Sequence, residues 1–464
     1  MPSSTLPFRT ALGACGVLIL GATILGTTAS AQTSPPPAPA PQFPLTATIT
    51  TPGYPGVGPA DPKLRVVNLP NGKKMHLLPA TLDTTQWGWF DNAQPPVLRV
   101  NSGDTIVLET MMHSHNQVVP GTTIEQIKKT RTDFPGRGPH TLTGPIYIEE
   151  AQPGDVLKVT LNKIVPRAYA TNFNVPGMFG EFPSLYADGQ VKYVYLDLDK
   201  MTSEFLPGVV IPLKPFPGTL AVARKEAGRF SSVPPGEFAG NMDIRDFVAG
   251  TSLYVPVYVP GALLWTGDSH AGQGNGEVNL TALETAYKEF NITVEVIKGK
   301  PLDFPRIEIK KSWISMGFDQ DMNKAWAQAK AQTVKLLAEL RGISPEQAEK
   351  LMPTVSDCRV SQVVNVKKGI HCLSPKNPRE AEDMERPTKE TPKYLVSYAK
   401  DADLNKAMDS ASMGMIKLLE TDKKIARLDA YGLASVAMDC RIGAISDTEK
   451  NVHCLMPKSI WVKK

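Results

Sequence analysis

The amino-acid sequence predicts a mainly β protein, with a β-sandwich or barrel-like core followed by C-terminal α+β units in tandem duplicate. Proline and glycine are frequent, at 41 and 36 of 464 residues, and this composition favours short strands joined by turns over long helical bundles. A second indication is that Gly-Asp pairs lead into runs of β-branched residues, as turns lead into strands. The third is a repeat in the last third of the chain, at an offset of 82 residues (401 − 319).

Residues 1–31 have the pattern of a secretory signal peptide. Arg9 is followed by an apolar run from Ala11 to Leu25, and Ala29-Ser30-Ala31 forms a small-x-small cleavage pattern. A membrane anchor is the alternative, but the run is short and contains Gly and Thr, which favours cleavage. We therefore expect a periplasmic or secreted protein without stable membrane insertion. The Pro-rich residues 32–60 are interpreted as an extended linker.

Residues 61–305 are predicted to form the β-rich core, with many short strands as in sandwiches and barrels. The clearest expected strands are Thr105–Glu109, Val156–Leu161, Leu253–Val259 and Ile292–Val296. Pro256 and Pro260 place the third of these strands at a sheet edge or a bulge, because proline cannot donate to a strand ladder.

Two α+β units are predicted to follow, at 306–380 and 381–464. Each begins with an Ala-, Lys- and Leu-rich helical pattern, at Asn323–Leu340 and at Asn405–Leu419, and a strand-like segment comes next. Two copies are too few for a solenoid, so we interpret them as one unit that is used twice.

Four cysteines remain once the signal peptide, which contains Cys15, is removed. They are Cys358, Cys372, Cys440 and Cys454. An even number in an exported protein indicates disulfides, and the equal spacing of 14 residues (372 − 358 and 454 − 440) favours one disulfide in each unit. Four buried free thiols are the alternative. Zinc is disfavoured here because neither pair has the C-x-x-C spacing.

The densest group of chemically active residues lies in the Gly-rich segment 267–277. It contains Asp268, His270, Gln273 and Glu277. Carboxylates and imidazole are suited to a divalent metal, and glycine lets a ligand approach the backbone closely. Asp268 and His270 would face the same side of a strand because a single residue separates them.

Two further segments could bring ligands to the same ion. His113 and His115 form a second pair with one residue between them, and Asn241 and Asp243 follow Gly240 in another polar stretch. Each histidine-containing pair alone is more often turn polarity than a metal site. Because the chain has only seven histidines, the two pairs together indicate a metal site in the β core.

Other functional classes fit the sequence poorly. Gly267-Asp268-Ser269 is similar to the serine block of GDS-type esterases, but no histidine has the aspartate three residues before it that those enzymes need. The glycines of Gly272–Gly276 have neither dinucleotide-binding nor P-loop spacing. With 50 basic and 46 acidic side chains and a net charge of +4, nucleic acid is not expected as a partner.

Four motifs carry a resemblance to a known family. They are Thr143–Glu149 with Ala151–Asp155, Gly240–Arg245, Gly267–Val278, and the Asp-Cys-Arg unit that occurs twice near the C-terminus. From about Pro96 to its end, the chain resembles the acetamidase/formamidase family of amide hydrolases. This resemblance implies a β-rich core with α+β additions and a homo-oligomer, dimer or higher. It also implies hydrolysis of short linear amides, of the formamide or acetamide type, to a carboxylate and ammonia.

The resemblance also implies a divalent metal, with zinc as the first choice, that activates water. The implied metal ligands are Asp243, Asp268 and His270, with His115 as a further ligand. Glu277 is expected to be the general base, and Asn241 to orient the amide. These residue types suit the chemistry, because a metal polarises the amide carbonyl and lowers the pKa of bound water toward ~7. A nearby carboxylate can then pass the proton to the leaving amine.

The chain departs from the family pattern in four places. It carries an export signal, its final unit is doubled, Ala239 replaces a glycine, and Asn279-Leu280 stands where a small Cys-Gly pair is common. These departures keep two alternatives open. One is a non-catalytic periplasmic amide-binding or scaffold protein on the same fold. The other is hydrolysis of a different carbon–nitrogen bond, such as that of a lactam or a ureide, because pocket volume decides among such substrates.

Overall fold

The structure, a computed structural model, describes residues 65–462. The predicted signal peptide, 1–31, and the predicted linker, 32–60, lie outside the described residues. Among the helices of residues 65–462, none combines the length and the apolar character needed to cross a membrane.

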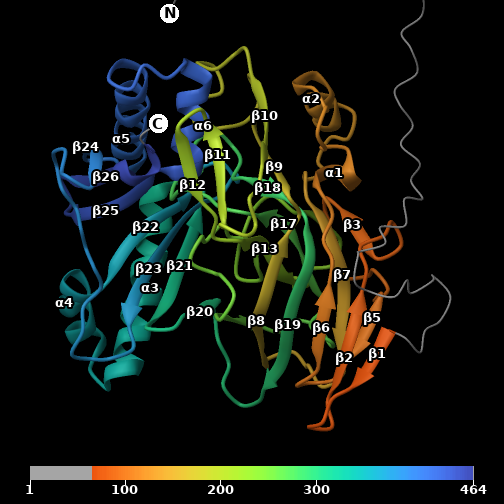
Figure 1. Ribbon diagram of the computed structural model, residues 1–464. Coiled ribbons are helices and arrows are strands. Elements are labelled where there is room, and N and C mark those ends of the chain that lie inside the picture. The colour runs from red at the N-terminus through yellow and green to blue at the C-terminus, as the bar shows by residue number, and fades with distance from the viewer. Residues whose placement is uncertain (1–64, 463–464) are drawn as a thin grey trace, which may run out of the picture. The chain divides into compact units, whose positions relative to one another are not determined.

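The largest sheet joins thirteen strands of the described residues, and its pairs are antiparallel except for β2 with β6 (Figure 1). In spatial order the strands are β1 (Val66–Asn68), β2 (Lys74–Leu78), β6 (Thr105–Leu108), β19 (Tyr287–Ile297), β8 (Val156–Pro166), β16 (Ser252–Pro256), β20 (Arg306–Glu308), β21 (Ser312–Asp319), β23 (Lys368–Pro375), β22 (Asp357–Gln362), β25 (Asp439–Ile445), β26 (Lys450–Pro457) and β24 (Tyr394–Asp401). The predicted core and both predicted C-terminal units thus contribute to one continuous sheet.

A second sheet of nine strands lies within the region predicted as the core. Its main path is β10 (Gln190–Tyr195), β9 (Tyr169–Asn174), β18 (Glu284–Thr285), β17 (Leu264–His270), β13 (Phe216–Val222) and β15 (Ala239–Asn241). On the other side of β17, β7 (Thr141–Ile148) pairs with β3 (Thr85–Trp87) and β5 (Leu98–Val100). Two small sheets are formed by β11 (Thr202–Leu206) with β12 (Val209–Pro212), and by β14 (Arg229–Ser231) with β4 (Trp89–Asp91).

The two large sheets share one apolar core. Leu108 of β6 and Ile292 of β19 belong to the same buried cluster as Leu142 of β7, Leu220 of β13 and Leu264 of β17. Each such side chain stabilises the fold by about 1.5–3 kcal/mol when it is fully buried. The prediction of a mainly β protein is therefore confirmed.

The helices are short in the core and long in the C-terminal units. Among residues 65–462 they are α1 (His113–Asn116), α2 (Ile124–Thr132), α3 (Met322–Arg341), α4 (Pro345–Val355), α5 (Leu404–Thr421) and α6 (Arg427–Ala437), with the 3₁₀ turn η2 (Lys458–Ile460). The predicted helical patterns correspond to α3 and α5. The side chain of Asp321 accepts a hydrogen bond from the Asn323 amide at the start of α3, and left-handed Gly342 ends that helix.

The same order of elements occurs in both C-terminal units: strand, helix, helix, strand, strand. In the large sheet, β21-β23-β22 adjoins β25-β26-β24, so the order of the second unit mirrors that of the first about the contact of β22 with β25 (Figure 1). Disulfides join Cys358 to Cys372 and Cys440 to Cys454. One disulfide in each unit, as the spacing predicted, links facing residues of two paired strands.

Two local expectations need correction. The sequence predicted that a strand-like segment follows the first helix of each unit, but α4 and α6 come between them. In the first unit the overlooked signal is Ser344-Pro345-Glu346-Gln347, which forms a capping box with proline in the first turn. The strand at Pro256 is not at a sheet edge, because β16 lies between β8 and β20. The proline is tolerated because short β20 pairs only with Ser252–Tyr254, which leaves Pro256 paired with β8 alone.

Candidate metal centre and active site

Asp268 and His270 lie on β17, the most enclosed strand of the second sheet. Every residue of β17 is buried, because β13 pairs along one edge and β7 and β18 along the other. The strand also brings in Glu284 of β18, whose Cα position faces that of His270. The predicted neighbourhood of Asp268 and His270 is therefore correct, and it lies in the interior of the sheet.

Seven ionisable side chains from six parts of the chain meet here, and we call them the site cluster. They are His113, His140, Asp243, Asp268, His270, Glu277 and Glu284. The Nε2 atom of His113 donates to Asp268 Oδ1 at 3.0 Å and lies 3.3 Å from Glu284 Oε2. The Nε2 atom of His270 is 3.3 Å from Asp268 Oδ1 and 3.2 Å from Glu284 Oε2. His270 Nδ1 is 3.7 Å from Asp243 Oδ1.

Three of the acids sit on strained backbone. Asp243, Asp268 and Glu277 all have φ of 51°, in the left-handed region that side-chain-bearing residues rarely adopt. Such conformations cost of order 1–3 kcal/mol each and cluster at functional sites. All three acids line the same cavity.

Gly218 of β13 makes room for the carboxylates. An ideal Cβ atom at this position would lie 2.4 Å from Asp268 Oδ2 and 2.6 Å from Asp243 Oδ1. Contacts of this length are prohibitive for any side chain, so glycine is required here by the site rather than by its own backbone angles.

Both C-terminal units hold the segment that carries Glu277. From the first unit, Ser361 O accepts from the Gly276 amide at 3.1 Å. From the second, Ser435 O accepts from the Gly274 amide at 2.9 Å, and the Cys440 amide donates to Asn275 O at 3.0 Å. The two C-terminal units thus contact the Gly-rich segment from two sides and hold Glu277, the residue next to it, in place.

The charges of the site cluster oppose one another. Burial, together with the nearby charge of Asp268, raises the pKa of Asp243 to about 7. Burial, together with Asp243, raises the pKa of Glu277 well above its usual range. Burial alone would lower the pKa of His113, but hydrogen bonds with Asp268 and Glu284 raise it to about 9. Burial lowers the pKa of His140 to about 4. Without a bound cation, protons on the carboxyls and imidazoles must balance the cluster.

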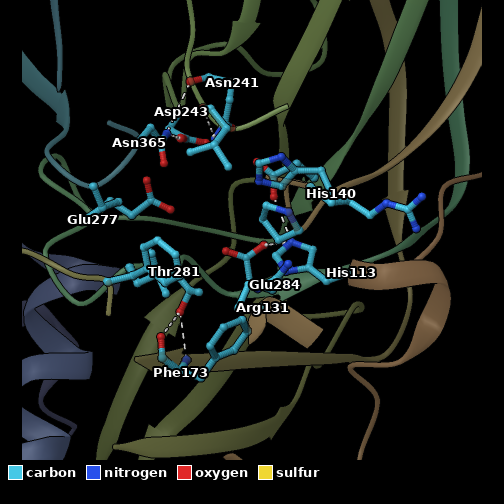
Figure 2. A pocket seen from close by; sticks show the side chains of 17 residues that line it. His113, Arg131, His140, Phe173, Asn241, Asp243, Glu277, Thr281, Glu284 and Asn365 are labelled. Atoms are coloured by element: carbon cyan, nitrogen blue, oxygen red, sulfur yellow. Dashed lines mark hydrogen bonds and ion pairs between the residues drawn. The ribbon is translucent and has the colours of Figure 1, made fainter. Parts of the chain in front are cut away.

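The cluster borders a cavity of about 80 Å³. Figure 2 shows Glu277 on one side of it and His113 and His140 on the other, with Asn241, Asp243 and Asn365 along a third wall. Asn241 is held in place, because its Oδ1 atom accepts from Thr219 Oγ1 at 3.0 Å and its Nδ2 atom donates to Val233 O at 3.2 Å. The cavity therefore offers a carboxyl group, an amide and a metal-type donor set to one small molecule.

Comparison with known proteins places this chain in a family. Residues 83–228 and 223–377 match the Acetamidase/Formamidase family, and together they span more than half of the chain. The chain belongs to this family. The family predicted from the sequence is thereby confirmed.

Individual members of the family are distant relatives. An acetamidase of Mycolicibacterium smegmatis is 27% identical over an alignment of 228 residues, and the match covers 34% of this chain and 54% of that protein. The chain thus spans about half the length of this curated relative. The crystal structure of an acetamidase from Yersinia enterocolitica is 26% identical, with a TM-score of 0.60 over 68% of this chain and 95% of that one. An acetamidase from Bacillus halodurans, also 26% identical, has a TM-score of 0.59 over 64% and 97% of the two chains.

The donor set of this family member fits a divalent cation. Three groups, each with its ligand atoms within 4.8 Å of one another, occur in the described residues: His113/His140/Asp268, Asp243/Asp268/His270 and His270/Glu277/Glu284. Several buried atoms of the cluster also have no hydrogen-bond partner in residues 65–462. They are Nδ1 of His113, Nδ1 and Nε2 of His270, Oδ1 of Asp243, and Oε2 of Glu277 and of Glu284. Buried polar atoms without partners are costly, and a cation would satisfy them.

Five of the six predicted catalytic and metal-binding residues meet at the cavity or in the cluster, and His115 does not. The predicted residues that come together are Asn241, Asp243, Asp268, His270 and Glu277. His115 contacts Thr85 Oγ1 at 3.3 Å and packs near the Trp87 ring. The one-residue spacing misled the prediction, because Ser114 and His115 have φ of 54° and 53° and are not strand residues. His113 contacts the cluster in its place.

Two members of the cluster escaped the sequence analysis altogether. His140 precedes β7 and lies 3.7 Å from Asp268 Oδ2, and Glu284 lies in a strand of two residues. Neither residue has a spacing that marks it, because each reaches the cluster through long-range strand pairing. The remaining signal was the scarcity of histidine in the chain, which made His140 worth testing.

Proposed function

We propose that this protein hydrolyses short linear amides, of the formamide or acetamide type, to a carboxylate and ammonia. The observation that carries the proposal is the buried Glu277 carboxyl, which faces the imidazole and carboxylate groups of the cluster across a small cavity (Figure 2). Membership of the Acetamidase/Formamidase family supports the same reaction.

In this proposal Asp243, Asp268 and His270 hold a divalent cation, together with Glu284 and His113. Zinc suits this set best, because imidazole and carboxylate are among its usual ligands. A bound cation supplies Lewis acidity beside the amide carbonyl.

Glu277 is the general base in the proposed mechanism. Burial and the nearby Asp243 raise the pKa of Glu277, and a raised pKa makes the carboxylate a stronger base. The carboxylate takes a proton from the attacking water and gives it to the leaving amine. Asn241, fixed by Thr219 and Val233, orients the amide. The reaction therefore needs one positioned carboxyl group that moves a proton twice.

The test is ammonia release from formamide, acetamide and propionamide by the purified mature protein, with and without a chelator. Release that the chelator abolishes and that added Zn²⁺ restores is the expected result, and the three acyl chains rank the pocket size. No release from any of the three, by protein that retains its metal, contradicts the proposal for small amides.

Absence of ammonia release would favour the alternative functions, and Leu280 gives a structural reason for one of them. Leu280 lines the cavity at one of the positions where the sequence departs from the family pattern. A larger side chain there favours a different carbon–nitrogen substrate, such as a lactam or ureide. A role as a periplasmic amide-binding or scaffold protein is the remaining alternative, and binding of an amide without turnover identifies it.

Three further proposals concern the chain as a whole. The two C-terminal units are copies of one ancestral unit, at 306–380 and 381–464, behind a core at 61–305. The protein is a homo-oligomer. It works in the periplasm or is secreted, which the two disulfides support because such bonds persist in oxidising compartments. Mass spectrometry of the exported protein tests the oligomer through the native mass. The same measurement tests export through the N-terminus and the disulfides.

A further inference from the structure

Arg131 places a buried positive charge on the wall of the cavity. It lies in the last turn of α2, and its Nη2 atom donates to Ser114 Oγ at 3.3 Å. The Nη1 atom is buried and has no hydrogen-bond partner in residues 65–462. Burial lowers the pKa of Arg131 only to about 10, so the guanidinium keeps its charge at neutral pH.

No carboxylate neutralises this charge within the described residues. The ion pairs of residues 65–462 include none with Arg131, and Asp268 and Glu284 pair with histidines. The charge does reach the site, since Arg131 is one of the groups that lower the pKa of His140, after burial and His113. A buried guanidinium with an unused donor beside a reaction site is costly unless an anion completes it.

A second arginine borders the same cavity. The guanidinium of Arg137 stacks 4.6 Å from the ring centroid of Trp87, and it too has no ion pair in the described part of the chain. Residues 132–136, between the two arginines, are exposed, so this wall lies on the solvent side of the cavity. Stacking holds a guanidinium by its face and leaves its edge free to donate.

Apolar side chains complete the wall. The cavity is lined by Phe173, Phe179, Val233, Leu280 and Val364 in addition to the polar groups. Hydrocarbon fits such a surface, and a carboxylate fits a guanidinium, which can bind it with two parallel hydrogen bonds.

From this arrangement we infer that the preferred substrate is an ω-amide of a short dicarboxylic acid. Its amide lies at the site cluster, its methylene chain lies against the apolar wall, and its free carboxylate binds Arg131. The inference rests on the proposed amide hydrolysis and narrows its substrate class. Formamide and acetamide, which lack the second group, would be poor substrates by comparison.

The test compares kcat/KM for ammonia release from succinamate with that from butyramide, which has the same number of carbons and no charge. Malonamate and glutaramate set the chain length. The wild-type protein is expected to prefer succinamate at least roughly tenfold, because a hydrogen bond to a charged group contributes that much discrimination. Arg131→Met is expected to reduce the preference by roughly 10- to 100-fold, mainly through KM for succinamate.

Lys129→Met is the matched control. It removes the same charge from the same helix, at a side chain that is 74% exposed, and the preference should stay within about twofold. A preference for butyramide in the wild type overturns the inference. So does an Arg131→Met protein in which both substrates lose activity equally, because Arg131 would then act on the acids of the cluster and not on the substrate.

A binding measurement separates this inference from the proposed function. Calorimetry with succinate, which has no amide to hydrolyse, tests carboxylate binding by Arg131 when the wild type is compared with Arg131→Met. If no amide releases ammonia but succinate binds and Arg131→Met weakens it roughly tenfold, the hydrolase proposal fails and the carboxylate site stands. If succinate binds both proteins equally, or neither of them, the carboxylate site is overturned.

Discussion

Two buried groups of charges lie a few residues apart in this molecule and are built on opposite principles. The site cluster contains histidines and carboxylates, and no lysine or arginine lies within 4 Å of its acids in residues 65–462. The second group, which we call the arginine cluster, joins the two C-terminal units. It consists of Arg245, Asp246, Asp357, Arg359, Asp439 and Arg441.

Each arginine of the arginine cluster has an aspartate partner. Arg359 faces Arg441 directly across β22 and β25, and such like charges repel. Asp357 compensates at 2.7 Å from Arg359 Nε, and Asp439 at 2.9 Å from Arg441 Nη2. The repeated Asp-Cys-Arg sequence therefore neutralises the junction between the two units, since each aspartate lies two residues from its arginine on the same face.

The comparison distinguishes a candidate functional site, the site cluster, from a structural contact between the two units, the arginine cluster. Both groups are buried, but one has a partner for each charge and the other has orphaned atoms and acids that retain protons. Perturbed pKa values alone would mark both groups. What identifies the candidate site is a set of buried donor atoms without hydrogen-bond partners in residues 65–462, together with a cavity and strained backbone.

The largest expected effect is on turnover. Glu277→Gln removes the proposed base but keeps the size of the side chain, and kcat for amides should fall by roughly 10²- to 10⁴-fold. Metal content and the urea midpoint should not change. Glu149→Gln, at a side chain that is 40% exposed, is the control and should keep full activity. Turnover that survives Glu277→Gln removes this residue as the base.

The largest expected loss of stability is in the arginine cluster. Asp439→Asn leaves Arg245 and Arg441 without their shared carboxylate, and it should lower the free energy of unfolding by about 3–5 kcal/mol. Equilibrium unfolding in urea measures the change. Asp447→Asn, at an exposed turn residue, should stay within about 0.5 kcal/mol. Equal effects of the two substitutions would show that the arginine cluster contributes nothing.

The pH dependence of that loss has a definite sign. The charges of Arg245 and Arg441 outweigh burial and hold the pKa of Asp439 below its usual range. A carboxyl with a lowered folded pKa stabilises the protein above its unfolded pKa, near ~3.9, and loses that contribution as pH falls through the folded value. The stability difference between wild type and Asp439→Asn should therefore be full at pH 6 and shrink below about pH 4.

The disulfides should contribute equally in the two units. Replacing Cys358 and Cys372 by serine, or Cys440 and Cys454, opens a loop of the same sequence separation, 14. Each double substitution should cost about 3 kcal/mol in the free energy of unfolding. Urea unfolding without reductant measures both, and an unequal result would contradict the equivalence of the two disulfides.

The smallest expected effect is a gain, not a loss, in the free energy of unfolding, and it comes from a substitution in the site cluster. In chelator-treated protein, Asp243→Asn removes a repelled carboxyl and should stabilise the fold by about 1–3 kcal/mol at pH 8. The folded pKa of Asp243, about 7, lies above its unfolded value. The wild type therefore loses stability relative to Asp243→Asn as pH rises between about 4 and 7. Destabilisation by Asp243→Asn at every pH would contradict the idea of a frustrated acid cluster.

The sequence predicted the parts of the molecule that local patterns determine. Turn signals indicated the strands at Thr105 and Val156, and Ala- and Leu-rich patterns indicated α3 and α5. The equal cysteine spacing indicated the two disulfides. The family motif located Asp268, His270 and Glu277, because they lie within ten residues of one another.

What the sequence could not supply depends on tertiary structure. His140, Glu284 and Arg131 come from three separate segments and meet only after β7, β18 and α2 have packed. His113 contacts the cluster in place of the predicted His115 because the backbone makes a left-handed turn there. No residue type in the sequence indicates this turn, since Ser114 has φ of 54° without being glycine. Strand pairing and backbone strain, not motif spacing, complete this site.

The most direct test of the account is the metal content of the purified mature protein beside that of His270→Asn, by elemental mass spectrometry. His270 lies in two of the three candidate ligand groups, and its replacement leaves the arginine cluster intact. The account predicts about one equivalent of a divalent metal, zinc first, in the wild type, and its loss from a folded His270→Asn protein. A metal-free wild type that hydrolyses amides at full rate, or metal retained by His270→Asn, would contradict it.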